Sequence, residues 1–197
     1  MAYPTVDGPY GLLPVKLLSG SPYSGVTRQY RVASGYATDI FYGDAVKLVT
    51  GGNVERDTFD AAMTPIGVFL GCTYTDPSTS QITFKQYWPA STVASDAKAY
   101  VCDATNVLFK AAVVSSGTTI GDLAITDIGA NVAGVDNTGS TVTGNSKSAI
   151  SDSSATTNTL PFRIVDLVEE TKNSSGGFTE ALVKWNAGHL FDNTTGV

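Results

Sequence analysis

The sequence predicts an all-β protein: a small β-barrel or sandwich with an extended N-terminal arm and a long Ser/Thr/Gly-rich insertion. Hydrophobic residues make up 42% of the 197 residues and charged residues only 15%, whereas a soluble domain has about 25% charged residues. Such a chain is too apolar to be disordered throughout. Between residues 26 and 112, apolar and polar residues alternate with the period of two that is typical of half-buried strands, as in Ile82-Thr83-Phe84-Lys85.

The first 24 residues form the expected N-terminal arm. They contain Pro4, Pro9, Pro14 and Pro22, and prolines at this spacing exclude a helix and a central strand. We expect an extended segment with one short strand at residues 15–18. Exposed Tyr and Leu side chains on such an arm are costly in water, so the arm lies either on its own domain or on a neighbouring molecule. In the second case, residues 2–12 contribute little to the stability of the isolated protein.

Two features of the following segment predict how its strands connect. Residues 98–102 and 107–111 read as strands, and the turn sequence 103–106 between them predicts a β-hairpin. Residues 66–74 are apolar without strict alternation and include Gly67 and Gly71. We expect a long strand there, bent or bulged, that crosses between two sheets.

Residues 115–160 differ from the rest of the chain. A short helical turn is expected at Thr119, after which Ser, Thr, Gly and Asn dominate, with isolated apolar residues such as Val132 and Ile150. This composition predicts either weak edge strands or a long extended loop. Regular structure resumes with a strand over residues 162–168, whose expected hairpin partner is residues 181–185. We therefore expect a single β domain over residues 25–197 that includes the insertion at about 115–160.

Net charge, apolar segments and cysteine content indicate which partners and which cellular compartment to expect. The formal net charge is −6 and the isoelectric point is near 4.6, which argues against a nucleic-acid partner held through its phosphates. The longest apolar cluster, residues 66–72, is far shorter than the ~18 residues of a membrane helix. The N-terminal residues lack the regions of a signal peptide. We expect a protein made in a cytoplasm, with Cys72 and Cys102 as buried free thiols rather than a disulfide.

Few residues carry catalytic chemistry. The single histidine, His189, is not accompanied by a nucleophile elbow or a cysteine-protease signature. One His and two Cys do not make a tetrahedral metal site, and the acidic loop at residues 136–140 lacks EF-hand spacing. The Asp residues stand mostly at turns, where Asp is common. We expect no enzymatic activity, no cofactor and no metal, and by elimination a structural protein.

Three stretches carry a resemblance to a class of bacteriophage virion proteins. They are GYATDIFYGDAVKL at residues 35–48, TPIGVFLGC at 64–72 with QYWP at 86–89, and GNS at 144–146 followed by LPFRIV at 160–165. Over roughly residues 10–190, the chain resembles head proteins of tailed phages from marine and fresh water. In outline it also resembles capsid decoration (cement) proteins, although the 115–160 segment departs from a minimal decoration barrel.

The resemblance implies a non-enzymatic protein of the virion. A decoration protein binds the outer surface of the head shell and stabilises it by bridging neighbouring major capsid subunits. The resemblance therefore implies the major capsid protein as partner and a homotrimer or homodimer on the capsid. It also implies synthesis in the host bacterial cytoplasm, with no nucleic acid and no membrane as partner.

Aromatic and apolar residues are the expected interface anchors, because Tyr and Trp are frequent hot spots. The candidates are Tyr3, Tyr10 and Leu12 in the arm, and Tyr87 and Trp88 at the end of an alternating strand. For Tyr87 and Trp88 the other interpretation is a position in the core. An alternative function is a tail-fibre or adhesion module that stacks host surface carbohydrate on Tyr87, Trp88 or Trp185. A barrel hydrolase with paired carboxylates is a further alternative.

Overall fold

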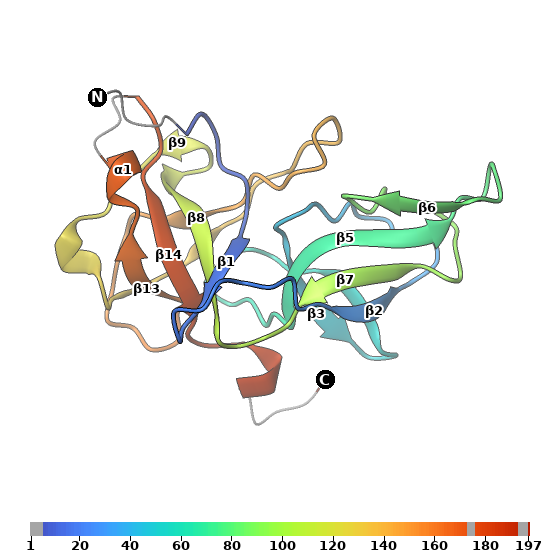
Figure 1. Ribbon diagram of the computed structural model, residues 1–197, viewed down its shortest axis with the longest axis horizontal. Helices are drawn as coiled ribbons and strands as arrows, with labels where there is room; N and C mark the ends of the chain where they lie inside the picture. Colours follow the sequence, from blue (N-terminus) through green and yellow to red (C-terminus); the bar gives the residue numbers. More distant parts are fainter. Residues whose placement is uncertain (1–5, 173–175, 193–196) are drawn as a thin grey trace.

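The computed structural model describes residues 6–172, 176–192 and 197, and it is nearly all β, with 40% strand and 5% helix. The predicted all-β fold class is thereby confirmed. Two groups of strands lie side by side along the longest axis of the molecule, with strand β1 between them (Figure 1). The first five residues, among them Tyr3, lie outside the described residues.

One group of strands closes into a barrel. Its strands are β2 (Arg28–Val32), β3 (Ala45–Val49), β4 (Asn53–Arg56), β5 (Gly67–Thr75), β6 (Ile82–Lys85) and β7 (Lys98–Cys102). The hydrogen-bonded order is β3-β4-β2-β7-β5, and β3 pairs again with β5. Five strands therefore complete a ring, and β6 lies outside it, paired only with β5 among the described strands. Closure removes the free edges of the five ring strands, but it leaves one edge of β6 unpaired.

The second sheet is built on β8 (Val107–Ser116). Its strand order is β10 (Asn131–Val132), β13 (Phe162–Leu167), β14 (Glu180–Trp185), β8, β12 (Ala149–Ser151) and β11 (Gly134–Val135). Strands β1 (Leu13–Leu17) and β9 (Thr119–Ile120) also pair with β8. The helices are short: η1 (Ile125–Asp127), α1 (Glu169–Lys172) and η2 (Leu190–Asp192). None of the described helices is long and apolar enough to cross a membrane.

One hydrophobic cluster joins the two groups of strands. Ala45, Val68 and Cys102 from the barrel belong to the same buried cluster as Phe109 and Val183 from the second sheet. The barrel has a further core of its own around Phe69, Val101 and Trp88. Since side chains from both sheets fill one core, the sheets cannot separate without exposing apolar surface.

The strands at residues 98–102 and 107–111 form as predicted, but the predicted hairpin between them is wrong. Strand β7 pairs with β2 and β5, and β8 pairs with strands of the other sheet. The intervening turn connects the two sheets, and its Asp103 is held by strand β2. The Asp103 carboxylate accepts a hydrogen bond of 2.7 Å from the Tyr30 hydroxyl and lies 3.1 Å from Arg28 Nε.

Strand β5 contains the predicted bulge. Its pairing with β7 shifts register between Phe69 and Cys72, and Gly71 at that point has φ of +133°, which other residues rarely adopt. The predicted crossing between two sheets is wrong, because β5 pairs only with barrel strands. The bend instead lets one strand contact β3 near its start and β6 near its end, which helps to close the barrel.

The insertion at about 115–160 packs against its own chain. The predicted helical turn at Thr119 is wrong, since Thr119 begins strand β9. The predicted edge strands are found, because β10 and β11 stand at the two ends of the strand order. Val132 and Ile150 are fully buried in the shared core. The predicted hairpin of β13 with β14 is confirmed, with Phe162 opposite Trp185.

The described part of the N-terminal segment lies on its own domain. Strand β1 begins two residues earlier than expected and pairs antiparallel with β8. Before it, the Gly11 and Leu12 amides donate hydrogen bonds of 2.9 Å to the carbonyls of Ser148 and Gly43. Main-chain bonds to both sheets therefore fix this segment in place.

Candidate functional site

The residues expected at an interface divide into buried and partly exposed positions. Leu12 and Trp88 are 0% exposed, and each belongs to a core cluster. Tyr10 and Tyr87 are partly exposed. The structure does not bring these four residues together as one surface, because Leu12 and Tyr10 contact the second sheet and Trp88 lies in the barrel. Leu12 and Trp88 are therefore core residues. For Trp88, a position in the core was the alternative that the sequence left open.

Trp88 is held by the barrel on its main chain and on its ring. Its amide and carbonyl exchange hydrogen bonds with Ile40, of 2.8 and 3.2 Å. Its ring meets the edge of Tyr74 with centroids 5.4 Å apart at 72°, a favourable aromatic geometry. Trp185 is also buried, between Phe109 and Phe162. Neither indole is available to stack on a sugar in this structure, and Tyr87 is itself stacked on Phe41.

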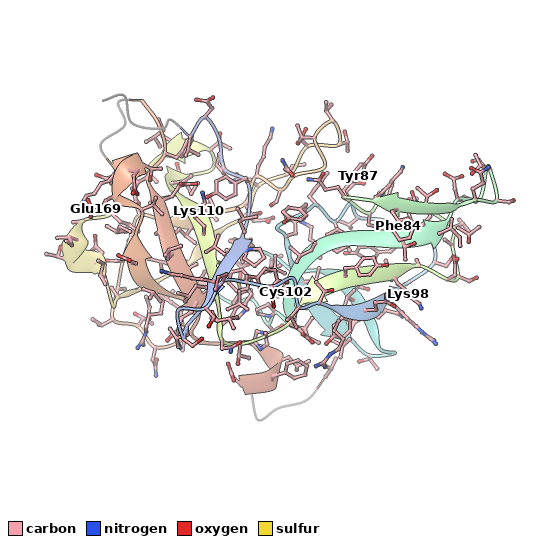
Figure 2. All side chains as sticks on the ribbon, in the orientation of Figure 1. Phe84, Tyr87, Lys98, Cys102, Lys110 and Glu169 are labelled. Atoms are coloured by element: carbon pink, nitrogen blue, oxygen red, sulfur yellow. The ribbon has the colours of Figure 1, made fainter. Side chains whose placement is uncertain are left out.

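The two most exposed apolar side chains of the barrel strands lie on strand β6. Ile82 is 71% exposed and Phe84 is 73% exposed, and both point to the same face because side chains alternate along a strand. Figure 2 shows Phe84 on the outer part of the barrel, apart from Tyr87. Phe84 borders an open groove of about 550 Å³ that is also lined by Tyr42, Leu70 and Tyr100. We define the β6 surface as Ile82, Phe84 and this groove.

A second exposed apolar group lies at the other end of the molecule. Ile125 and Ile128, in and directly after helix η1, are 63% and 38% exposed. Figure 1 places η1 and β6 at opposite ends of the longest axis. We call Ile125 and Ile128 the η1 surface. Asp127 fixes this turn, because its carboxylate accepts hydrogen bonds from the Ala124 amide and the Ser154 hydroxyl, both 2.7 Å long.

Tyr10 serves as an anchor within the chain. Its hydroxyl donates a hydrogen bond to the buried Glu180 carboxylate, which also pairs with Lys110 Nζ at 2.9 Å. The Lys110 ammonium lies 5.7 Å from the centre of the Tyr10 ring, a cation–π distance. Burial, followed by the hydrogen bond to Glu180, raises the pKa of Tyr10 far above its usual value. Tyr10 therefore stays neutral and fastens the N-terminal segment to β8 and β14.

A buried carboxylate attaches the loop at residues 136–148 to the barrel. Asp44 is 1% exposed and accepts hydrogen bonds from the Phe41 amide (2.9 Å) and the Ser146 hydroxyl (2.6 Å). Arg56 Nε lies 3.0 Å from the same carboxylate, and Arg56 Nη2 lies 2.5 Å from Asp136. Burial raises the pKa of Asp44, although the Arg56 charge acts in the opposite direction. These groups satisfy one another, which is the arrangement of a structural network.

His189 lies inside the protein, although it stands near the C-terminal end of the chain. It is 1% exposed, its ring centroid is 5.6 Å from that of Trp185, and Nδ1 accepts a 3.3 Å hydrogen bond from the Phe191 amide. Nε2 has no hydrogen-bond partner among the described residues. Burial lowers the pKa of His189, against a smaller opposing effect of Asp192. The imidazole is therefore a neutral core group near neutral pH.

The thiols are buried and unpaired, as predicted. Cys72 and Cys102 are both free, and burial raises the pKa of Cys72 to about 12, which keeps it in the unreactive thiol form. Within residues 6–172 and 176–192, no three His, Cys, Asp or Glu side chains gather as a metal ion would require.

Comparison with known proteins gives no family. No family model, curated protein or solved structure matches this chain.

The β6 surface and the η1 surface are the functional candidates that sequence reasoning missed. Phe84 stands in the same stretch, residues 84–89, as the candidates Tyr87 and Trp88, so the sequence did indicate the region. The alternation Ile82-Thr83-Phe84-Lys85 also indicated one apolar face. Neither pattern shows that β6 lies outside the closed ring, which is the reason that this face is uncovered.

Proposed function

We propose that this protein is a non-enzymatic decoration (cement) protein of a bacteriophage head. It binds the outer surface of the shell and stabilises the shell by bridging neighbouring major capsid subunits. The observation that carries the proposal is the pair of exposed apolar surfaces at opposite ends of one β body, Ile82 with Phe84 at one end and Ile125 with Ile128 at the other. A bridging protein needs contacts at two separate places.

The body between the two surfaces suits a protein under mechanical load. A common core with Phe109 and Val68 joins the sheets. The Arg56–Asp136 ion pair and the Ser146–Asp44 hydrogen bond hold the long loop to the barrel. Expansion of the shell would therefore pull on packed side chains and main-chain hydrogen bonds, rather than open a hinge between the two groups of strands. Several weak contacts acting together then give firm attachment. The net charge of −6 disfavours binding to packaged DNA.

We assign the η1 surface to the capsid subunit. Ile125 and Ile128 lie in one short turn that Asp127 braces from within the chain, so the two side chains form a small rigid apolar contact. Truncating well-packed apolar anchors at an interface costs more than altering the polar residues around them.

The first experiment locates the protein. Mass spectrometry of purified virions should find the chain at a copy number proportional to that of the major capsid subunit, and a cryo-electron map should show it on the outer shell. Heads that lack the protein should release DNA at a lower temperature than decorated heads. Absence of the chain from virions, or equal release temperatures, contradicts the proposal, and binding of the isolated protein to a glycan array would favour the adhesion alternative.

The second experiment tests the assigned surface on heads that lack the protein. Ile125→Asp combined with Ile128→Asp should lower occupancy at least tenfold, by loss of anchors that are worth about 1 kcal/mol or more each. Thr126→Asp is the control for added negative charge, because Thr126 is exposed in the same turn and the change adds one carboxylate there without removing an apolar side chain. If both variants bind equally well, the η1 surface does not contact the capsid.

A further inference from the structure

We propose that β6 is a dimerisation edge: it pairs antiparallel with β6 of a second copy across a two-fold axis at Thr83. This inference goes beyond the capsid role and does not depend on it. It begins from an uncovered strand edge. Strand β6 has one hydrogen-bonded neighbour, β5, among the described strands, and native proteins usually protect such an edge with charge, proline or a covering loop.

The main chain of β6 directs its free groups outward at its two apolar residues. The Asp76 amide donates a 2.9 Å hydrogen bond to the Gln81 carbonyl, so these residues form a hydrogen-bonded pair of the β5–β6 ladder. Hydrogen-bonded and non-hydrogen-bonded pairs alternate along antiparallel strands. The pairs of Ile82 with Thr75 and of Phe84 with Thr73 are therefore non-hydrogen-bonded, and the N–H and C=O groups of Ile82 and Phe84 point to the unpaired edge.

A two-fold axis at Thr83 makes this edge complementary to itself. It places Ile82 of one copy opposite Phe84 of the other, twice, so that each residue exchanges both of its free main-chain hydrogen bonds. Directly opposed residues share a face of the sheet, so four exposed apolar side chains form one continuous band. An axis at Ile82 would instead place Phe84 opposite Ser80, whose φ of +56° lies outside the strand region. An axis at Phe84 would place Ile82 opposite the polar Gln86.

Charge also favours this register. Lys85 is the charged residue of the segment 78–87, and the axis at Thr83 sets it opposite the neutral Gln81 of the second copy. No two like charges are directly opposed, an arrangement that would weaken a strand pair. Lys85 lies 5.8 Å from the centre of the Tyr87 ring of its own chain, which draws its charge toward that ring.

The contact between the two β6 strands covers a small area. Each aromatic side chain buries at most about 150–250 Å², so two Phe84, two Ile82 and the strand backbones cover less than the roughly 1,200 Å² of a stable interface. We therefore expect a reversible dimer that dissociates on dilution, with a dissociation constant in the micromolar range or weaker. Joining at β6 leaves the η1 surface of each copy free at the outer ends.

The first test is sedimentation of the full chain over a wide range of concentration. The wild-type protein should shift from monomer to dimer. Phe84→Lys should raise the dissociation constant about a hundredfold, roughly tenfold for each of the two rings lost. Val142→Lys is the matched control, because Val142 is apolar and 94% exposed on the loop at residues 136–148, and it should dimerise as the wild type does. A monomer at every concentration, or a dimer that Phe84→Lys leaves intact, overturns the proposal.

The second test fixes the register by mild oxidation. In the proposed pairing the two Thr83 Cα atoms lie about 4.5 Å apart, within disulfide range, so Thr83→Cys should crosslink into a dimer. Gln81→Cys is more exposed, but its two copies would be four residues apart, about 13 Å, and should not crosslink. The native Cys72 and Cys102 are buried. Crosslinking of Gln81→Cys at the rate of Thr83→Cys overturns the register.

Discussion

The guanidinium of Arg56 lies 3.0 Å from the buried carboxylate of Asp44, Nε to Oδ2. This pair joins strand β4 to the loop before β3, and through Asp136 and Ser146 it joins both to the loop at residues 136–148. Removing one partner of a buried pair is more damaging than removing both, since it leaves an uncompensated charge inside the protein.

The first prediction concerns this pair. Arg56→Leu should lower the free energy of unfolding by about 3 kcal/mol, because the buried Asp44 carboxylate loses the guanidinium charge that faces it. Asp44→Asn combined with Arg56→Leu should recover part of that loss. Urea unfolding measures both values. Arg31→Leu, at an exposed position on β2, is the control and should change stability by no more than about 0.5 kcal/mol. Equal loss in the single and double variants would show that the charge of Asp44 is not the cause.

The second prediction concerns the N-terminal segment. Leu12→Ala should cost about 2–4 kcal/mol, because Leu12 is fully buried in the core shared by the two sheets. Leu18→Ala is the matched control, since Leu18 is 52% exposed just after β1, and should cost far less. Deletion of residues 2–12 should lower the melting temperature, which reverses the expectation from the sequence. A truncated chain that melts at the wild-type temperature would restore that expectation.

The third prediction separates the roles of Phe84 and Trp88. Trp88→Ala should destabilise the monomer by about 3–5 kcal/mol, since it empties a core position. Phe84→Ala should leave the melting temperature nearly unchanged, because Phe84 is mostly exposed, and should weaken self-association instead. Calorimetry and sedimentation of both variants provide the comparison. The assignment of roles is wrong if Phe84→Ala loses stability and Trp88→Ala does not.

The sequence predicted strands well because a strand's pattern is local. The strand at residues 98–102 follows from its own residue pattern, and the β13–β14 hairpin follows from two such patterns with a short connection between them. Each of these signals lies within one segment of the chain. The partners of β7 were not predictable in this way. The turn at residues 103–106 suits a hairpin, but Asp103 bonds to Tyr30 and Arg28 on a distant strand, and no local pattern reports such a contact.

The candidate surfaces were only partly predictable for a related reason. Alternation divides a strand into two faces without showing which face is covered. Trp88 and Phe84 are both aromatic and stand four residues apart, yet Trp88 pairs with Ile40 inside the barrel while Phe84 lies on a strand outside the ring. Ring closure depends on the pairing of β3 with β5, two strands separated by strand β4 and the loop at residues 57–66. Which of the residues 82–88 are buried therefore depends on contacts between segments that are far apart in the sequence.

The last prediction concerns pH and His189. Burial lowers the pKa of His189 in the folded protein, whereas in the unfolded chain its pKa is about 6.5. As the pH falls through 6.5, the unfolded chain binds a proton before the folded protein does, so the free energy of unfolding decreases on acidification. The charged groups that act on His189 are Asp192 and, more weakly, Asp103, and both oppose the shift without overcoming burial.

The measurement is urea unfolding between pH 7.5 and 5.5, with His189→Gln as the reference variant. Glutamine cannot titrate, and its side-chain carbonyl can accept the Phe191 amide hydrogen bond that Nδ1 now accepts. The wild type should lose stability over this range, and the variant, although less stable overall, should show a flatter profile.

Two buried carboxyl groups also titrate on acidification. Asp44 and Asp57 have raised pKa values in the folded state, chiefly through burial, so their protonation raises the free energy of unfolding and opposes the effect of His189. Both carboxyl groups are present in the wild type and in His189→Gln, so their contribution is common to the two profiles and the difference between the profiles reports His189. Parallel profiles for the two proteins would mean that His189 is not the group responsible.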